Sequence, residues 1–127
     1  MVDGASECEL CRLEQVLFED EEAYVRYDNN SLSRGHVLIV PRRHVAGFFD
    51  MTAGEKAAML ALLDRAQAHI DAEFKPDGYN IGVNIGRAAG QSRMHVHVHL
   101  IPRYTDDVAD PSGGVRCVLT KRATSSH

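Results

Sequence analysis

The 127-residue chain lacks tryptophan and any long apolar run, and only 6% of its residues are aromatic. Its apolar runs span a few residues each, which predicts neither a secretion signal nor a membrane span. Basic residues do not dominate, because 14 Lys and Arg stand against 18 Asp and Glu for a formal net charge of −4. This charge argues against a nucleic-acid partner, whereas a small anion needs only a local positive site.

Cysteine is too scarce for a disulfide framework, since there are three and the number is odd. Two of them form Cys8-x-x-Cys11, a spacing used by metal sites and by redox pairs. The redox interpretation ranks low because no thioredoxin-like βαβ pattern surrounds the pair. Without a secretion signal or a disulfide framework, the expected location is the cytoplasm.

Apolar residues are abundant enough for one core. At 44% hydrophobic and 25% charged, the composition is typical of a soluble globular protein. The length allows a single domain over residues 1–127. We expect its core to span about residues 8–118, with a loose end on each side.

The clearest expected element is a helix that begins at Thr52. Thr52-Ala-Gly-Glu55 fits a capping box, in which each side chain bonds the backbone of the other. Apolar residues then recur at helical spacing and form one face: Met59, Leu63, Ala66, Ile70 and Phe74. Pro76 and Gly78 are expected to end this helix.

Strands are expected at residues 24–27, 37–40, 79–85 and 94–101, with a short last strand at 115–119. The apolar run at 37–40 is followed by Pro41 and is too short for a helix, which indicates a central strand. Residues 10–18 fit either a short helix or a strand. The order predicts an α+β fold, with a mainly antiparallel sheet and one long amphipathic helix.

The strongest functional signal is His95-Val-His97-Val-His99. On a strand, alternate side chains share a face, so the three imidazoles would stand about 6.6–7 Å apart in a row. Two of them could bracket one phosphate group. A polar outer strand face is the simpler alternative, although three of the seven histidines in alternation argue against chance. A catalytic zinc site is a second alternative, ranked below phosphate handling.

The preceding loop offers groups that bind anions. Gly86 and Gly90 allow close backbone approach, and Gln91 and Ser92 add an amide and a hydroxyl. Glycine-bearing connections are common, so this loop carries weight only beside the histidines.

His-x-His-x-His before two apolar residues, with Ala-Gly-Gln-Ser upstream, resembles the histidine triad (HIT) superfamily of nucleotide hydrolases and transferases. The resemblance runs from about residue 8 to 118 and includes Gly35-His36, Pro41 and residues 101–104. It implies a HIT-like fold, closest to zinc-bearing members with a dinucleoside polyphosphate hydrolase-like core. A histidine at the third position disfavours the uridylyltransferase branch, which has glutamine there. The tail lacks the Trp-containing ending of the purine-nucleoside phosphoramidase branch.

The resemblance implies that His97 attacks the α-phosphorus of a nucleotide and forms a nucleotidyl-histidine that water hydrolyses. His99 would contact the phosphate and help the leaving group depart. The implied substrate contacts are Asp28, His36, Asn84, Gln91, Ser92 and His99. From the residues alone, Asp28 is better explained as a turn cap. For His36, a hydrogen-bonded core histidine explains the sequence equally well.

Zinc-bearing members of the superfamily complete their cysteine pair with two histidines, which correspond here to His44 and His95. The resemblance therefore implies that Cys8, Cys11, His44 and His95 hold Zn²⁺. Such a site would be structural, because four protein ligands leave no open position. A homodimer is likewise implied.

The expected function is hydrolysis of dinucleoside polyphosphates or related adenylates. One alternative is a nucleoside phosphoramidase that cleaves P–N bonds. Another is a nucleotide-binding sensor or scaffold with weak hydrolysis.

Overall fold

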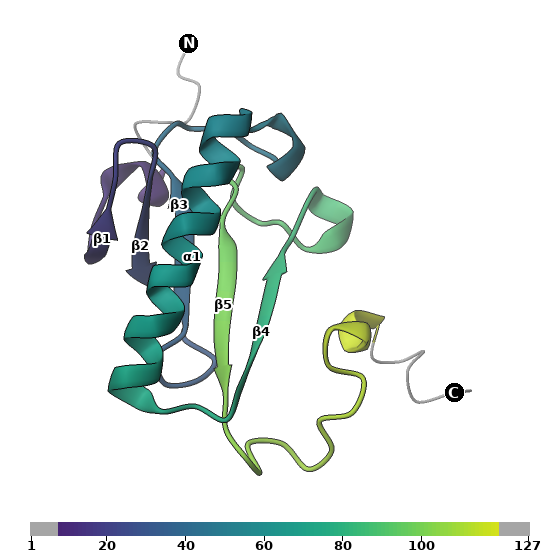
Figure 1. The fold of residues 1–127 in the computed structure, drawn as a ribbon. Coiled ribbons are helices and arrows are strands. Elements are labelled where there is room, and N and C mark those ends of the chain that lie inside the picture. The colour runs from purple at the N-terminus through teal and green to yellow at the C-terminus, as the bar shows by residue number, and fades with distance from the viewer. Residues whose placement is uncertain (1–7, 120–127) are drawn as a thin grey trace.

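The computed structural model describes residues 8–119, which form one sheet with a long helix across one face (Figure 1). The predicted loose ends lie outside the described residues. The elements are β1 (Val16–Glu19), β2 (Ala23–Tyr27), β3 (Val37–Pro41), α1 (Ala53–Phe74), β4 (Gly78–Val83) and β5 (Val98–Arg103). The sheet order is β1-β2-β3-β5-β4, and all neighbouring strands are antiparallel. The predicted α+β class is confirmed.

Helix α1 begins at the predicted capping box. The Glu55 amide donates to the Thr52 hydroxyl at 3.0 Å, and the Thr52 amide donates to the Glu55 carboxylate at 2.8 Å. Lys75 adopts a left-handed conformation (φ 51°) and closes the helix just before Pro76. The apolar residues buried on α1 differ slightly from the prediction, because Leu62 is buried whereas Leu63 is only partly so.

Strand β3 is buried along its whole length, as its continuous apolar run predicts. Val37 and Ile39 pack in the cluster that includes α1 residues. Leu38 and Val40 pack on the other face against Leu10, which belongs to a short 3₁₀ helix. This packing holds the N-terminal segment against the sheet face opposite α1.

Three expected elements differ in the structure. Strand β5 begins at Val98 rather than at residue 94, because the Val96 amide donates to the Val45 carbonyl at 2.9 Å outside the sheet. Strand β4 ends at Val83 rather than at residue 85. The strand expected at 115–119 is wrong, since Gly114–Leu119 is a 3₁₀ helix preceded by a left-handed glycine.

Residues 10–18, expected to form either a short helix or a strand, contain part of each. It divides into the 3₁₀ helix Glu9–Arg12 and strand β1. Leu13 and Gln15, both with positive φ, separate them. Among the helices between residues 8 and 119, none combines the length and the hydrophobicity of a membrane-spanning segment.

Candidate active site and metal centre

The three histidines of the motif lie just before and at the start of β5, but they do not form one uniform row. His95 is buried and faces the two cysteines, whereas His97 and His99 are partly buried neighbours with ring centroids 5.1 Å apart. The reason is that only His99 lies within the regular strand, where it is opposite Leu38 of β3.

The proton on His97 is placed by a backbone contact. Nδ1 of His97 lies 2.9 Å from the carbonyl oxygen of His95. A carbonyl can only accept, so Nδ1 carries a proton, and the lone pair of the neutral imidazole is therefore on Nε2. An imidazole in this tautomer is a nucleophile without any further deprotonation.

His99 receives its orientation from His36, which is 1% exposed. The Leu32 amide donates to Nδ1 of His36 at 3.0 Å, so the His36 proton is on Nε2. That nitrogen lies 3.0 Å from Nδ1 of His99 and donates to it. His99 must therefore carry its own proton on Nε2, where it can donate to a ligand. His36 is thus a hydrogen-bonded core histidine behind His99, and its direct contact with substrate stays a prediction.

The hydrogen bonds from the Leu32 amide to His36 and from His36 to His99 form a relay. Both histidines of this relay are held neutral. Burial lowers the pKa of His99 to about 4, with the neighbouring His97 and His36 acting in the same direction and Asp28 opposing them. Burial also lowers the pKa of His36, again against the effect of Asp28. The neutral forms are the ones that the two hydrogen bonds require.

The depressed pKa of His99 predicts a loss of stability in acid. With a folded pKa of about 4 against an ordinary value of 6.5, His99 binds protons more readily in the unfolded chain over that interval. The free energy of unfolding should therefore fall as pH drops from 6.5 towards 4. Urea denaturation of His99→Gln should show a smaller loss between about pH 7 and about pH 5, by about 1–2 kcal/mol. Equal losses in the variant and the parent protein would contradict this assignment.

Asp28, His36 and His99 also bring three possible metal ligands within 4.8 Å of one another. The Leu32 amide occupies the His36 Nδ1 lone pair, and the proton on Nε2 leaves that nitrogen unable to bind a metal. We therefore interpret this cluster as a hydrogen-bond relay. Within residues 8–119, no cluster gathers the three histidines of the motif, so the geometry gives the catalytic-zinc alternative no support.

Asp28 itself forms the turn cap that its sequence context indicates. One carboxylate oxygen accepts the Asn30 amide at 3.0 Å, and the other lies 3.4 Å from Nε2 of His36. Its predicted contact with substrate stays a prediction.

Hydrogen bonds of the Gln91 side chain hold the loop before the histidine motif in place. Gln91 is buried, and its side chain accepts the Gly86 amide at 2.8 Å while donating to the carbonyls of Ala46 at 2.6 Å and Arg93 at 2.9 Å. Gly86 and Gly90 have φ of 89° and 95°, which glycine adopts without strain. The Gln91 amide therefore shapes the loop, and its predicted phosphate contact stays a prediction.

Ser92 and Asn84 lie at the surface near this loop. Both are exposed, so a ligand can reach either side chain. Their contacts with substrate stay predictions.

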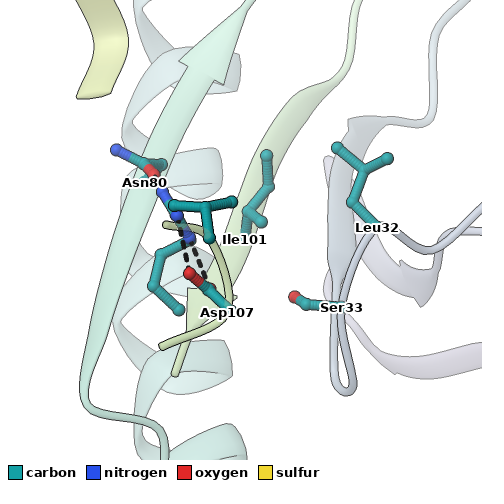
Figure 2. Close-up of a pocket in the computed structure, with 7 residues that line it drawn as sticks. Leu32, Ser33, Asn80, Ile101 and Asp107 are labelled. Carbon is teal, nitrogen blue, oxygen red and sulfur yellow. Dashed lines mark hydrogen bonds and ion pairs between the residues drawn. The ribbon is translucent and has the colours of Figure 1, made fainter. Parts of the chain in front are cut away.

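Two cavities border the sheet face that carries His99. Figure 2 shows the first, about 270 Å³, with Leu32 and Ser33 opposite Ile101 of β5. The second, about 440 Å³, is bordered by His99 and Asn84 and by the 3₁₀ helix Gly114–Leu119. Both cavities form between segments far apart in the chain, so no local sequence pattern indicates their outline.

The four predicted metal ligands come together in the structure. Their ligand atoms all lie within 4.8 Å of one another. Nδ1 of His95 lies 3.4 Å from the Cys8 sulfur and 3.3 Å from the Cys11 sulfur, and Nδ1 of His44 lies 3.2 Å from the Cys11 sulfur. Sulfur and nitrogen ligands around one tetrahedral zinc would be about 3.5 Å apart.

The orientation of His95 also suits a metal ligand. Its Nε2 lies 2.7 Å from the Pro41 carbonyl and must donate to it. The lone pair is therefore on Nδ1, which faces both thiols. Two thiols and two imidazoles are a donor set that zinc prefers, so these residues can hold a metal ion.

Known proteins of one family resemble this chain. The HIT domain model matches residues 12–106. The chain is 38% identical over 93 residues to the uncharacterized HIT-like protein MJ0866 of Methanocaldococcus jannaschii, covering 73% of this chain and 71% of that protein. It is 36% identical over 92 residues to a bis(5'-adenosyl)-triphosphatase of Saccharomyces cerevisiae, covering 72% of this chain and 45% of the yeast protein.

A solved structure extends the likeness to nearly the whole chain. A Zn-bound histidine triad family protein from Mycobacterium smegmatis superposes with a TM-score of 0.74 at 26% identity, covering 97% of this chain and 100% of that one. The matched family model spans β1 through β5 and includes both His36 and the three histidines of the motif. The chain therefore belongs to the HIT family.

Proposed function

We propose that this protein is a nucleotide hydrolase that forms a covalent nucleotidyl-histidine at His97. Its substrates would be dinucleoside polyphosphates or related adenylates. The observation that carries the proposal is the hydrogen bond from Nδ1 of His97 to the His95 carbonyl, which leaves Nε2 as the nucleophile. The likeness to a bis(5'-adenosyl)-triphosphatase supports this class of substrate.

The reaction would proceed in two displacements. The Nε2 lone pair of His97 forms a bond to the α-phosphorus as the P–O bond to the leaving phosphate breaks, and that group departs as an anion. Water then attacks the same phosphorus, the P–N bond breaks, and one water proton is released as His97 regains its lone pair. Two easier steps thus replace one difficult step.

His99 would act on the same phosphate through its Nε2–H. The relay from Leu32 through His36 keeps that proton in place, and a fixed donor stabilises charge that develops on a phosphate oxygen. Asp28 and Ser92 are the proposed contacts to ribose and phosphate. The cavity beside His99 has room for part of the leaving group.

We also propose that Cys8, Cys11, His44 and His95 hold a structural Zn²⁺. The sulfur-to-nitrogen separations and the His95 tautomer support this assignment, as does the Zn-bound relative. The ion would cross-link three segments without offering an open position for substrate. His95 connects this site to the nucleophile, because its backbone carbonyl holds His97.

The homodimer implied by the family resemblance stays a prediction. Strand β4 lies at one edge of the described sheet, and Ile81 on it is 50% exposed. An edge strand of this kind can pair with a second chain.

A substrate panel tests the proposed reaction. Purified protein should release AMP from diadenosine polyphosphates faster than from adenosine phosphoramidate, by at least about tenfold in kcat/KM, which corresponds to about 1.4 kcal/mol. Released nucleotide can be measured by chromatography. Faster cleavage of the P–N bond would favour the phosphoramidase, and tight binding without turnover would favour the sensor.

A further inference from the structure

The carboxylate of Glu9 joins the metal-binding segment to both proposed substrate loops. Glu9 lies between the two cysteines of the metal site. One oxygen pairs with the Arg93 guanidinium at 2.7 Å, and the other accepts from the side-chain amide of Asn29 at 2.5 Å. Arg93 directly follows Ser92, and Asn29 directly follows Asp28. The Glu9 side chain therefore contacts both the loop that carries Ser92, a proposed phosphate contact, and the turn that carries Asp28, a proposed ribose contact.

A buried arginine holds Glu9 in this position. Arg26 is 1% exposed, and its Nη2 lies 3.3 Å from the same Glu9 oxygen that Asn29 contacts. Nη1 of Arg26 is buried with no hydrogen-bond partner among the described residues. A buried guanidinium with an incomplete set of partners depends strongly on its counterion. The Glu9 side chain is only 21% exposed and its Arg26 partner 1%, so this pair differs from the solvated ion pairs that contribute little.

We propose that Glu9 is a positioning residue that couples occupancy of the metal site to nucleotide affinity. With metal bound, Cys8 and Cys11 hold their 3₁₀ helix, and Glu9 on that helix holds Asn29 and Arg93. Without metal the helix keeps Leu10 in the core but loses its two thiolate anchors, so the loops gain freedom that nucleotide binding must remove. This coupling rests on the proposed function, because it assumes that these loops contact the nucleotide.

Coupling of this kind is reciprocal, which makes it measurable from either ligand. Removal of zinc from the parent protein should weaken AMP binding by at least about fivefold, the lower end of typical coupling between sites. AMP should tighten zinc binding by the same factor. Calorimetry measures the first quantity, and competition with a chelator measures the second.

Glu9→Gln tests the role of the carboxylate, because it keeps the side-chain shape but removes the charge. In this variant, zinc removal should change AMP affinity by less than about twofold. Arg93→Gln should weaken the coupling while leaving the Glu9–Arg26 pair in place, so it serves if Glu9→Gln fails to fold. Glu14→Gln is the matched control, since the Glu14–Arg12 pair is solvent-exposed, and it should keep the coupling of the parent protein.

Hydrogen exchange distinguishes failure of the coupling from failure of the proposed function. The amides of Asp28, Leu32 and Gln91 are hydrogen-bonded within the two loops. Zinc removal should speed their exchange in the parent protein, and in Glu9→Gln they should exchange fast even with zinc bound. If zinc-loaded protein does not bind AMP, the proposed function fails and exchange alone decides the coupling. Unchanged exchange after zinc removal, or AMP affinity that does not depend on zinc, would overturn the inference.

Discussion

Replacement of His97 by alanine is expected to abolish turnover of a diadenosine polyphosphate while AMP still binds. The variant lacks the nitrogen that forms the covalent bond, so kcat should fall by about a thousandfold or more. The Asp28 turn and the loop braced by Gln91 do not depend on this imidazole, so the dissociation constant for AMP should change by less than about fivefold. Steady-state kinetics and calorimetry measure the two effects separately.

The proposed covalent intermediate on His97 can also be detected directly. Parent protein quenched in alkali during turnover should carry one nucleotide on His97, since P–N bonds resist alkali and break in acid. Peptide mass spectrometry locates the adduct. His69→Ala is the matched control, because His69 lies on α1 against Phe18 and should keep both turnover and the adduct. Normal turnover by His97→Ala would contradict the mechanism.

Loss of one thiolate from the proposed metal site is expected to release zinc and lower thermal stability. Cys8→Ser removes a ligand 3.4 Å from Nδ1 of His95, and a structural zinc contributes its binding free energy to folding. We expect about one zinc per chain in the parent protein, less than about a tenth of that in the variant, and a Tm lower by about 10 °C or more. Elemental analysis and thermal denaturation measure these quantities.

Cys117→Ser controls for loss of a thiol as such. Cys117 lies in the 3₁₀ helix Gly114–Leu119, with its sulfur beside the Ser112 carbonyl and outside the metal cluster. This variant should keep its zinc and its Tm. A parent protein that folds fully without metal and has the same Tm as Cys8→Ser would exclude the site.

Several local features could be predicted because their physical cause lies within a few residues. The capping box of α1 involves Thr52 and Glu55, three positions apart. The apolar run of β3 by itself indicates burial on both faces. The spacing of the histidines and of Cys8 and Cys11 indicated candidate phosphate and metal chemistry, and the resemblance to a family added His44 and His95 as predicted metal ligands.

Other features depended on partners far along the chain. The start of β5 at Val98 follows from a bond between Val96 and Val45, which no local pattern indicates. The segment 115–119 was predicted as a strand from its apolar residues, yet it forms a 3₁₀ helix. Strand propensity alone does not provide the neighbouring strand that its hydrogen bonds require.

The fold class, the long helix, the central strand and the residue types available for phosphate and metal chemistry follow from the sequence alone, because periodicity and spacing act locally. Long-range contacts in the folded chain set which nitrogen of His36, His95 and His99 carries the proton. His36 and His99 are 63 residues apart, and His95 and Pro41 are 54 apart. It also placed Glu9 against Asn29 and Arg93. Tautomers and buried charges depend on which groups meet in space, and folding alone brings these groups together.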